Sequence, residues 1–148
     1  MWKYCCLAAL AGACALAADR PDLTGTWHLD TEHSQVAESH KAETWSITQK
    51  PESIEIVQAF TDSGGKERKI QIHCSTMGQE CKVDEAGQPT QVTMYYNGPV
   101  LVMLEQWHGT NFVTKKRLKT SDDGKTLVVE VNHIAPPRKD ENWTFLKQ

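Results

Sequence analysis

The sequence predicts an all-β fold, an antiparallel up-and-down meander with at most one short helix. Segments of alternating apolar and polar residues recur along the chain, which is typical of strands with one buried and one exposed face. Turns that contain Gly separate these segments, and Gly or Asn supplies the positive φ that hairpin turns need. These turns lie at 62–66, 84–87, 97–99 and 122–125.

Ten segments have the alternation and the β-branched content of strands. They are 23–29, 44–49, 53–61, 67–74, 81–83, 91–96, 100–108, 112–120, 126–134 and 143–147. Residues 30–42 are polar and predict a loop or one short helix. Because no repeat or linker interrupts the series, residues 19–148 are predicted to form a single domain.

Residues 1–18 are predicted to be a signal peptide. Lys3 supplies the initial positive charge, an apolar stretch runs from Tyr4 to Leu16, and small residues lead to Ala18. The stretch is too short to span a bilayer, and no later segment is apolar enough to do so. We therefore expect an exported protein, periplasmic or secreted, with no transmembrane segment. An alternative is a lipoprotein anchored at Cys14, although the residue three positions before this cysteine is Ala and not Leu.

Removal of the leader leaves two cysteines, Cys74 and Cys81, in an exported chain. Such a pair predicts one disulfide, and the polar segment 75–80 between them would place it at the base of a hairpin. The remaining chain has 15 basic and 19 acidic residues, since Lys3 is the one charge in the leader. An acidic balance argues against a nucleic-acid partner, which would require a basic surface.

Alternation also identifies the side chains that would face the interior. The candidates for the lining of a binding site are Trp45, Ile54, Ile56, Ile72, Met94, Tyr96 and Met103. The run 100–104 is apolar on both faces, so it is either a covered central strand, which we favour, or an exposed patch that recruits another protein.

Lys116 belongs to the basic cluster 115–119. On a strand, Lys115, Arg117 and Lys119 share one face, while Lys116 shares the other face with Leu118. If that second face is interior, Lys116 could neutralise the carboxylate of a ligand, because a buried charge needs a partner. The alternative is a solvated strand with Lys116 at the rim.

The segment Leu23-Thr24-Gly25-Thr26-Trp27 at the start of the meander resembles the opening strand of the calycin group, which comprises lipocalins, fatty-acid-binding proteins and avidins. It is most similar to small exported bacterial lipocalin-like proteins. The resemblance implies a lipocalin-like barrel of about 8–10 strands, closed at one end by Gly25 and Trp27. It also implies that a cation from a late strand stacks on the Trp ring. The candidate cations are Arg117, Arg138 and Lys147.

Motifs for catalysis or metal binding are not recognisable. The six histidines form no H-x-H or H-E-x-x-H pair, and no nucleophile elbow occurs. Glu105 and Glu130 lie within apolar strands and could be inward acids, although the neighbours of Glu130 favour an outward position. We therefore predict a protein with no metal, no cofactor and no catalytic residue.

The predicted function is non-catalytic binding of a small apolar or amphipathic molecule, as a carrier or sensor. The site would comprise the apolar candidates above and Lys116. One alternative is a protein-interaction module whose barrel is filled by its own side chains. A small extracytoplasmic enzyme is the less favoured alternative. An open cavity of several hundred Å³ would favour the carrier.

Overall fold

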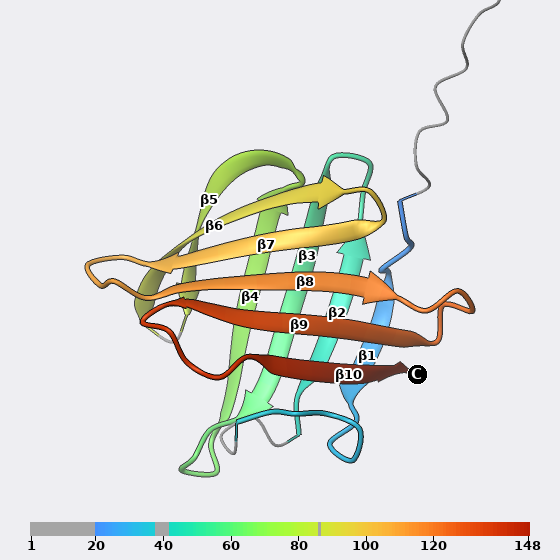
Figure 1. Ribbon diagram of the computed structural model, residues 1–148, viewed down its shortest axis with the longest axis horizontal. Helices are drawn as coiled ribbons and strands as arrows, with labels where there is room; N and C mark the ends of the chain where they lie inside the picture. Colours follow the sequence, from blue (N-terminus) through green and yellow to red (C-terminus); the bar gives the residue numbers. More distant parts are fainter. Residues whose placement is uncertain (1–19, 38–41, 86) are drawn as a thin grey trace, which may run out of the picture.

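Ten antiparallel strands form one sheet that curls into a nearly closed barrel in the computed structural model (Figure 1). The structure describes residues 20–37, 42–85 and 87–148, so the predicted signal peptide and Cys14 lie outside the described residues. The strands are β1 (Gly25–Leu29), β2 (Thr44–Gln49), β3 (Ser53–Thr61), β4 (Glu67–Ser75), β5 (Met77–Glu85), β6 (Gln88–Asn97), β7 (Val100–Trp107), β8 (Val113–Thr120), β9 (Thr126–Ala135) and β10 (Glu141–Lys147).

The order of the strands around the barrel is β4-β3-β2-β1-β10-β9-β8-β7-β6-β5. Neighbours in the sheet are neighbours in the chain, except that β1 pairs with β10 and so joins the two ends of the meander. The predicted all-β up-and-down barrel is confirmed, and the described residues contain no helix. The largest difference in bounds concerns the segment predicted as 81–83, which belongs to a strand of nine residues, β5.

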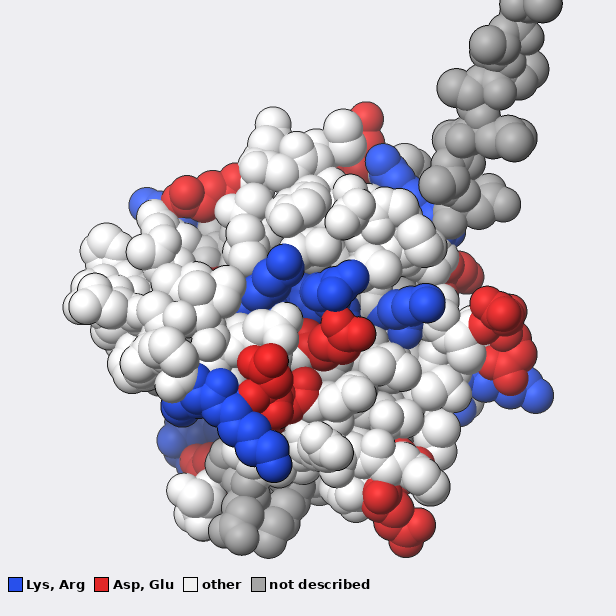
Figure 2. Space-filling view, in the orientation of Figure 1, with Lys and Arg blue, Asp and Glu red and all other residues white. Residues whose placement is uncertain are grey.

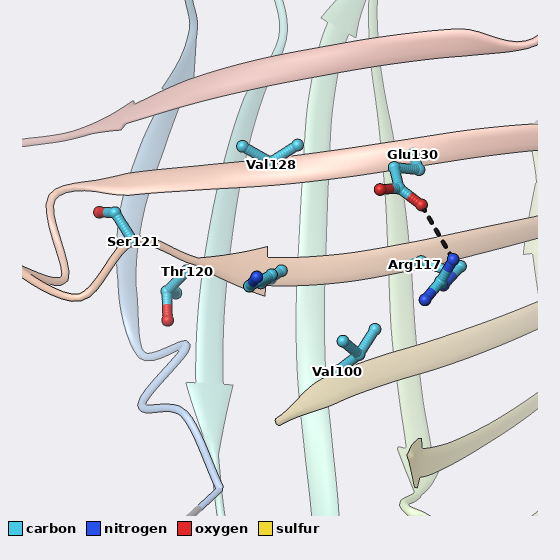
Figure 3. Close-up of a pocket in the computed structure, with 7 residues that line it drawn as sticks. Val100, Arg117, Thr120, Ser121, Val128 and Glu130 are labelled. Atoms are coloured by element: carbon cyan, nitrogen blue, oxygen red, sulfur yellow. Dashed lines mark ion pairs between the residues drawn. The ribbon is translucent and has the colours of Figure 1, made fainter. Parts of the chain in front are cut away.

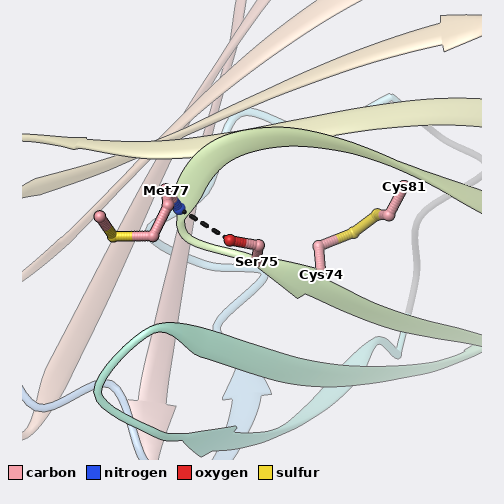
Figure 4. Close-up of a disulfide and its surroundings, with 4 residues drawn as sticks. All are labelled: Cys74, Ser75, Met77 and Cys81. Atoms are coloured by element: carbon pink, nitrogen blue, oxygen red, sulfur yellow. Dashed lines mark hydrogen bonds between the residues drawn. A yellow bond between two sulfur atoms is a disulfide. The ribbon is translucent and has the colours of Figure 1, made fainter.

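The barrel has one seam, between β4 and β5. These strands follow each other in the chain with only Thr76 between them, yet they lie at opposite ends of the hydrogen-bonded order. The predicted disulfide between Cys74 and Cys81 is confirmed, and it crosses this seam with the two Cα atoms 5.6 Å apart (Figure 4). The expectation that it staples the base of a hairpin is wrong, because no ladder joins the two strands.

Connections alternate between the two ends of the barrel because successive strands are antiparallel. We call the end with residues 20–24 and the β8–β9 connection the closed end. We call the end with residues 30–37 and the β9–β10 connection the loop end. In Figure 1 the described part of the β1–β2 connection and the β3–β4 connection both lie at the bottom of the view, at the loop end.

The closed end is built around Trp27 of β1, which is fully buried and donates an indole hydrogen bond to the Leu23 carbonyl at 2.9 Å. The ammonium of Lys147 lies 5.1 Å from the centre of the Trp27 ring, a cation–π contact. The register of β1 and β10 pairs Trp27 with Lys147, which explains why this cation and not Arg117 or Arg138 is in place. Gly25 has a φ of 143°, and a Cβ there would lie 2.6 Å from the Lys147 Cε. Gly25 therefore makes room for the cation.

The apolar run 100–104 lies in β7, a central strand between β6 and β8. Leu101 and Met103 face the interior, and Val102 on the opposite face is also buried. The run is therefore covered, as predicted, and does not form an exposed patch.

Candidate functional site

The barrel interior is apolar toward the closed end. Six of the seven apolar candidates are buried in the barrel: Trp45, Ile54, Ile56, Ile72, Met94 and Met103. Trp45 and Met103 lie at the level of their ladder partners, Gln58 and Lys116. Trp45, Ile56 and Met94 keep no solvent-accessible surface at all. A residue on the wall of a cavity that admits even one water would keep some, so these side chains fill the space around them. Tyr96 is half-buried near the closed end, with the Arg20 guanidinium 4.8 Å from its ring centre.

Toward the loop end the interior becomes polar, and Lys116 lies at the centre of this region. Its side chain points inward from β8, and the residue is 8% exposed. The ammonium lies 2.8 Å from the Glu105 Oε1, and Glu105 on β7 is itself 4% exposed. The Lys116 ammonium also lies 5.7 Å from the centre of the Trp143 ring. The solvated alternative for Lys116 is wrong, and the carboxylate that it meets belongs to the protein.

The register of neighbouring strands produces this ion pair. β7 and β8 pair Met103 with Lys116 and Glu105 with Thr114, so Lys116 and Glu105 are diagonal neighbours on the inward face. Diagonal side chains of this kind lie within reach of each other when they are long. Glu130, the other acid within an apolar strand, points outward to Arg117.

Glu85 at the end of β5 is a second carboxyl of the polar region. Burial raises its pKa to about 7, and the Glu105 charge adds to this effect, whereas Lys116 and the Trp107 side chain act in the opposite direction. At Lys116, burial acts to lower the pKa, but Glu105, Glu85 and Glu43 together raise it above the ordinary lysine value. Lys116 is therefore cationic, and three carboxyl groups act on this single ammonium.

Two further polar side chains, Glu43 and Gln58, lie toward the loop end. The Trp45 indole donates a hydrogen bond to Glu43, which is buried next to the start of β2. Gln58 on β3 pairs with Trp45 across the ladder, and it points inward because it alternates with Ile54 and Ile56. Gln58 is 5% exposed, and its Nε2 has no hydrogen-bond partner among the residues that the structure describes. Buried polar atoms are normally paired, so this amide is an exception that needs an explanation.

A depression of about 480 Å³ opens on the surface at the loop end, between residues 34–37 and the β9–β10 connection. His133 and Glu141 form part of its wall, and their side chains pair at 3.0 Å. Glu141 also accepts hydrogen bonds from the Trp143 indole at 2.8 Å and from the Ala37 backbone at 2.9 Å. The Trp143 ring also makes the cation–π contact with the Lys116 ammonium. Glu141 and Trp143 therefore link this depression to the buried ion pair.

A second depression, of about 410 Å³, lies on the outer face of β8 and β9 and is shown in Figure 3. Val128, Val100 and the Arg117–Glu130 pair line it, with 3.2 Å between the charged atoms. Both side chains are about half exposed, so water screens their attraction. Figure 2 shows basic and acidic side chains next to each other over this face, without a patch of one sign.

Sequence reasoning identified Lys116 and Glu105 as possible inward charges but missed Glu85 and Gln58. The signal for both was the same alternation. Glu85 shares a face with Val83, and Gln58 shares one with Ile56. A lining predicted from apolar positions, with Lys116 as its one polar member, omits these two residues.

Within the described ranges, no three His, Cys, Asp or Glu side chains are arranged to hold a metal ion. The same residues include no helix that is long and apolar enough to cross a bilayer.

Neither models of protein families nor curated protein sequences match the chain. Solved structures do. The wild-type fluorescent protein UnaG is 16% identical with a TM-score of 0.63, over 85% of this chain and 97% of UnaG. A secretory abundant heat soluble protein from Ramazzottius varieornatus is 9% identical with a TM-score of 0.67, over 89% of this chain and 99% of that one.

Lipid binding protein 8 from Caenorhabditis elegans is 10% identical with a TM-score of 0.65, over 84% of this chain and 94% of that protein. At such identities the likeness concerns the fold and not the activity. The chain has the calycin-like barrel fold that these proteins share.

Proposed function

We propose that this protein binds a small amphipathic molecule at the loop end of the barrel, as an exported carrier or sensor without catalytic activity. The observation that carries the proposal is the polar region inside the barrel, centred on the buried pair of Lys116 and Glu105. Replacing a buried ion pair by well-packed apolar residues is often neutral or stabilising. A barrel selected only for stability therefore has little use for this pair, whereas a binding site needs oriented polar groups.

The geometry suggests where such a molecule would lie. Its polar head would reach Lys116, Glu105, Glu85 and Gln58, and the depression at the loop end, which is lined mainly by polar side chains, would be its entrance. A volume of about 480 Å³ is in the range of small-molecule sites. The predicted apolar lining, from Trp45 to Met103, would form the floor of the site. Met94 and Met103 are the members best able to change rotamer when a ligand enters more deeply.

One of the neighbours in fold supports binding as the general function, because it is named a lipid binding protein. Export is supported by the disulfide across the seam, since disulfides persist in oxidising compartments. Whether the leader ends at Ala18 or at a lipidated Cys14 would be read from the mass of the mature N-terminus.

The filled apolar half favours a second candidate, the protein-interaction module. Exposed large apolar residues would then form the contact surface, and Met77 and Tyr95 are such residues at paired positions of β5 and β6. This candidate gives the buried ion pair no role.

Native mass spectrometry of the mature protein, purified from its own host's extracytoplasmic fraction, tests the proposal. We expect a discrete small-molecule adduct that is lost when the protein is unfolded. The matched control is a double variant, Lys116→Met with Glu105→Leu, which removes the charged pair and should remain folded but lose the adduct. A bare wild-type mass, together with a protein partner recovered through Met77 and Tyr95, would contradict the proposal and support the interaction module.

A further inference from the structure

The charges inside the barrel carry information on the head group that the site would accept. Among the residues that the structure describes, Lys116 is the one buried lysine or arginine, and Glu105 already holds it at 2.8 Å. The Glu85 and Glu43 charges act on the same ammonium. An entering carboxylate would therefore have to displace an internal partner and would face two further acids. A fatty-acid head is the wrong chemistry for this interior.

A cationic head meets the opposite situation. Lys116 is the cation that acts on Glu85, and its ammonium is paired with Glu105 at 2.8 Å. A half-buried carboxyl without a full counter-charge gains from a cation that arrives with the ligand, because charge-assisted hydrogen bonds are the strong ones. The acids of this region would thus supply acceptors for an ammonium.

The second observation is independent of charge. Gln58 is more than nine-tenths buried, points into the barrel near Glu43, and has an Nε2 without a partner among the described residues. This amide is a donor, so it requires an oxygen acceptor. A ligand that offers a hydroxyl or carbonyl oxygen close to its ammonium would satisfy Gln58 and the acids together.

We propose that the head group recognised by this barrel is a protonated amine with a neighbouring oxygen acceptor, as in an amphipathic amino alcohol, and not the carboxylate of a fatty acid. The inference rests on the proposed function, because it specifies the ligand of the same site. The Glu85 carboxylate would accept from the ammonium, and the Gln58 amide would donate to the oxygen. Lys116 would hold Glu105 in position.

Four amphiphiles with the same chain length test the proposal: 1-amino-2-dodecanol, dodecylamine, dodecanol and dodecanoate. Each is titrated below its critical micelle concentration at pH 7.5 into the mature, oxidised protein, and binding is followed by calorimetry and by tryptophan fluorescence. We expect the amino alcohol to bind most tightly and dodecanoate most weakly, with about tenfold or more between the amines and the carboxylate. The shared tail means that the differences report on the head group.

Three variants assign the effect to residues. Glu85→Gln should weaken both amines about tenfold and leave dodecanol unchanged. Glu130→Gln is the matched control, because it removes the same charge from the outer face and should change none of the affinities. Gln58→Leu should abolish the advantage of the amino alcohol over dodecylamine. Far-UV circular dichroism confirms that each variant is folded.

The outcomes separate the two proposals. Equal or tighter binding of dodecanoate would overturn the head-group assignment and leave the binding function in place. Equal losses in Glu85→Gln and Glu130→Gln would also overturn it, because the preference would then come from net charge alone. If no amphiphile binds and the native spectrum shows no adduct, the proposed function and this inference are both refuted.

Discussion

Lys116→Met is the most informative single change, because it removes the cation from a buried pair and leaves Glu105 behind. Removing one partner of a buried ion pair costs about 3–5 kcal/mol. Protonation of the abandoned carboxylate limits this cost, and the free energy of taking up a proton falls by about 1.4 kcal/mol for each pH unit of acidification. The destabilisation should therefore be largest at neutral pH and recover on acidification.

Urea unfolding of wild type and variant at pH 5 and pH 7 measures both quantities. We expect a loss of about 3–4 kcal/mol at pH 7 that falls to about 1–2 kcal/mol at pH 5. Arg117→Met is the matched control on the same strand, since its pair with Glu130 is about half exposed and is worth about 0–1 kcal/mol. If Lys116→Met costs no more than Arg117→Met at pH 7, or if its cost is the same at both pH values, Lys116 is not buried against Glu105.

Three further predictions concern stability. The raised Glu85 pKa of about 7 means that the folded state binds this proton more tightly than the unfolded state. Relative to Glu85→Gln, the free energy of unfolding of wild type should therefore fall by about 2 kcal/mol between pH 4.5 and pH 7. Parallel pH profiles of the two proteins would contradict the assignment. Gly25→Ala should cost about 1–3 kcal/mol through its positive φ and the Lys147 clash, and in a Lys147→Ala background only the backbone part should remain. Equal melting temperatures of wild type and Gly25→Ala would refute this role. Replacement of Cys74 and Cys81 by Ser should lower the free energy of unfolding by about 2–3 kcal/mol, because the disulfide closes a short loop. A smaller loss relative to oxidised wild type than relative to reduced wild type would contradict this prediction.

The fold was predictable because local patterns determine it. Alternation along segments such as 53–61 identifies a strand and its buried face together, and Gly in the turns fixes where each strand ends. The meander then needs no distant information, since nearly every pairing joins chain neighbours. The exception is the pairing of β1 with β10, which joins the two ends of the chain. That register places Lys147 on the Trp27 ring. Because the sequence does not reveal the register, it left three candidate cations open.

The site was less predictable because it depends on diagonal contacts between strands. Alternation allowed an inward Lys116, but only the register of β7 against β8 places Glu105 beside it. The unpaired seam is a second example. Two strands joined by one residue normally suggest a hairpin, whereas here the curvature of the whole sheet separates β4 from β5. No local signal in 67–85 records that curvature.

The seam leaves the molecule with two strand edges whose backbone groups have no ladder partner on that side. Such edges can accept a strand from a second copy and so start assembly. Here the edges carry charged or polar outward side chains, among them Lys69 and His73 on β4 and Lys82 and Asp84 on β5. A covalent bond also holds them face to face at the closed end.

In an oxidising compartment the disulfide thus keeps the two edges close together and hinders the approach of a foreign strand. In a reducing compartment, only side-chain charge would oppose the addition of a foreign strand. Screening that charge with salt, or removing it by a change of pH, would favour aggregation. The disulfide therefore protects the monomeric state more than it supports the core. The redox potential of the surroundings determines how well the monomer is protected.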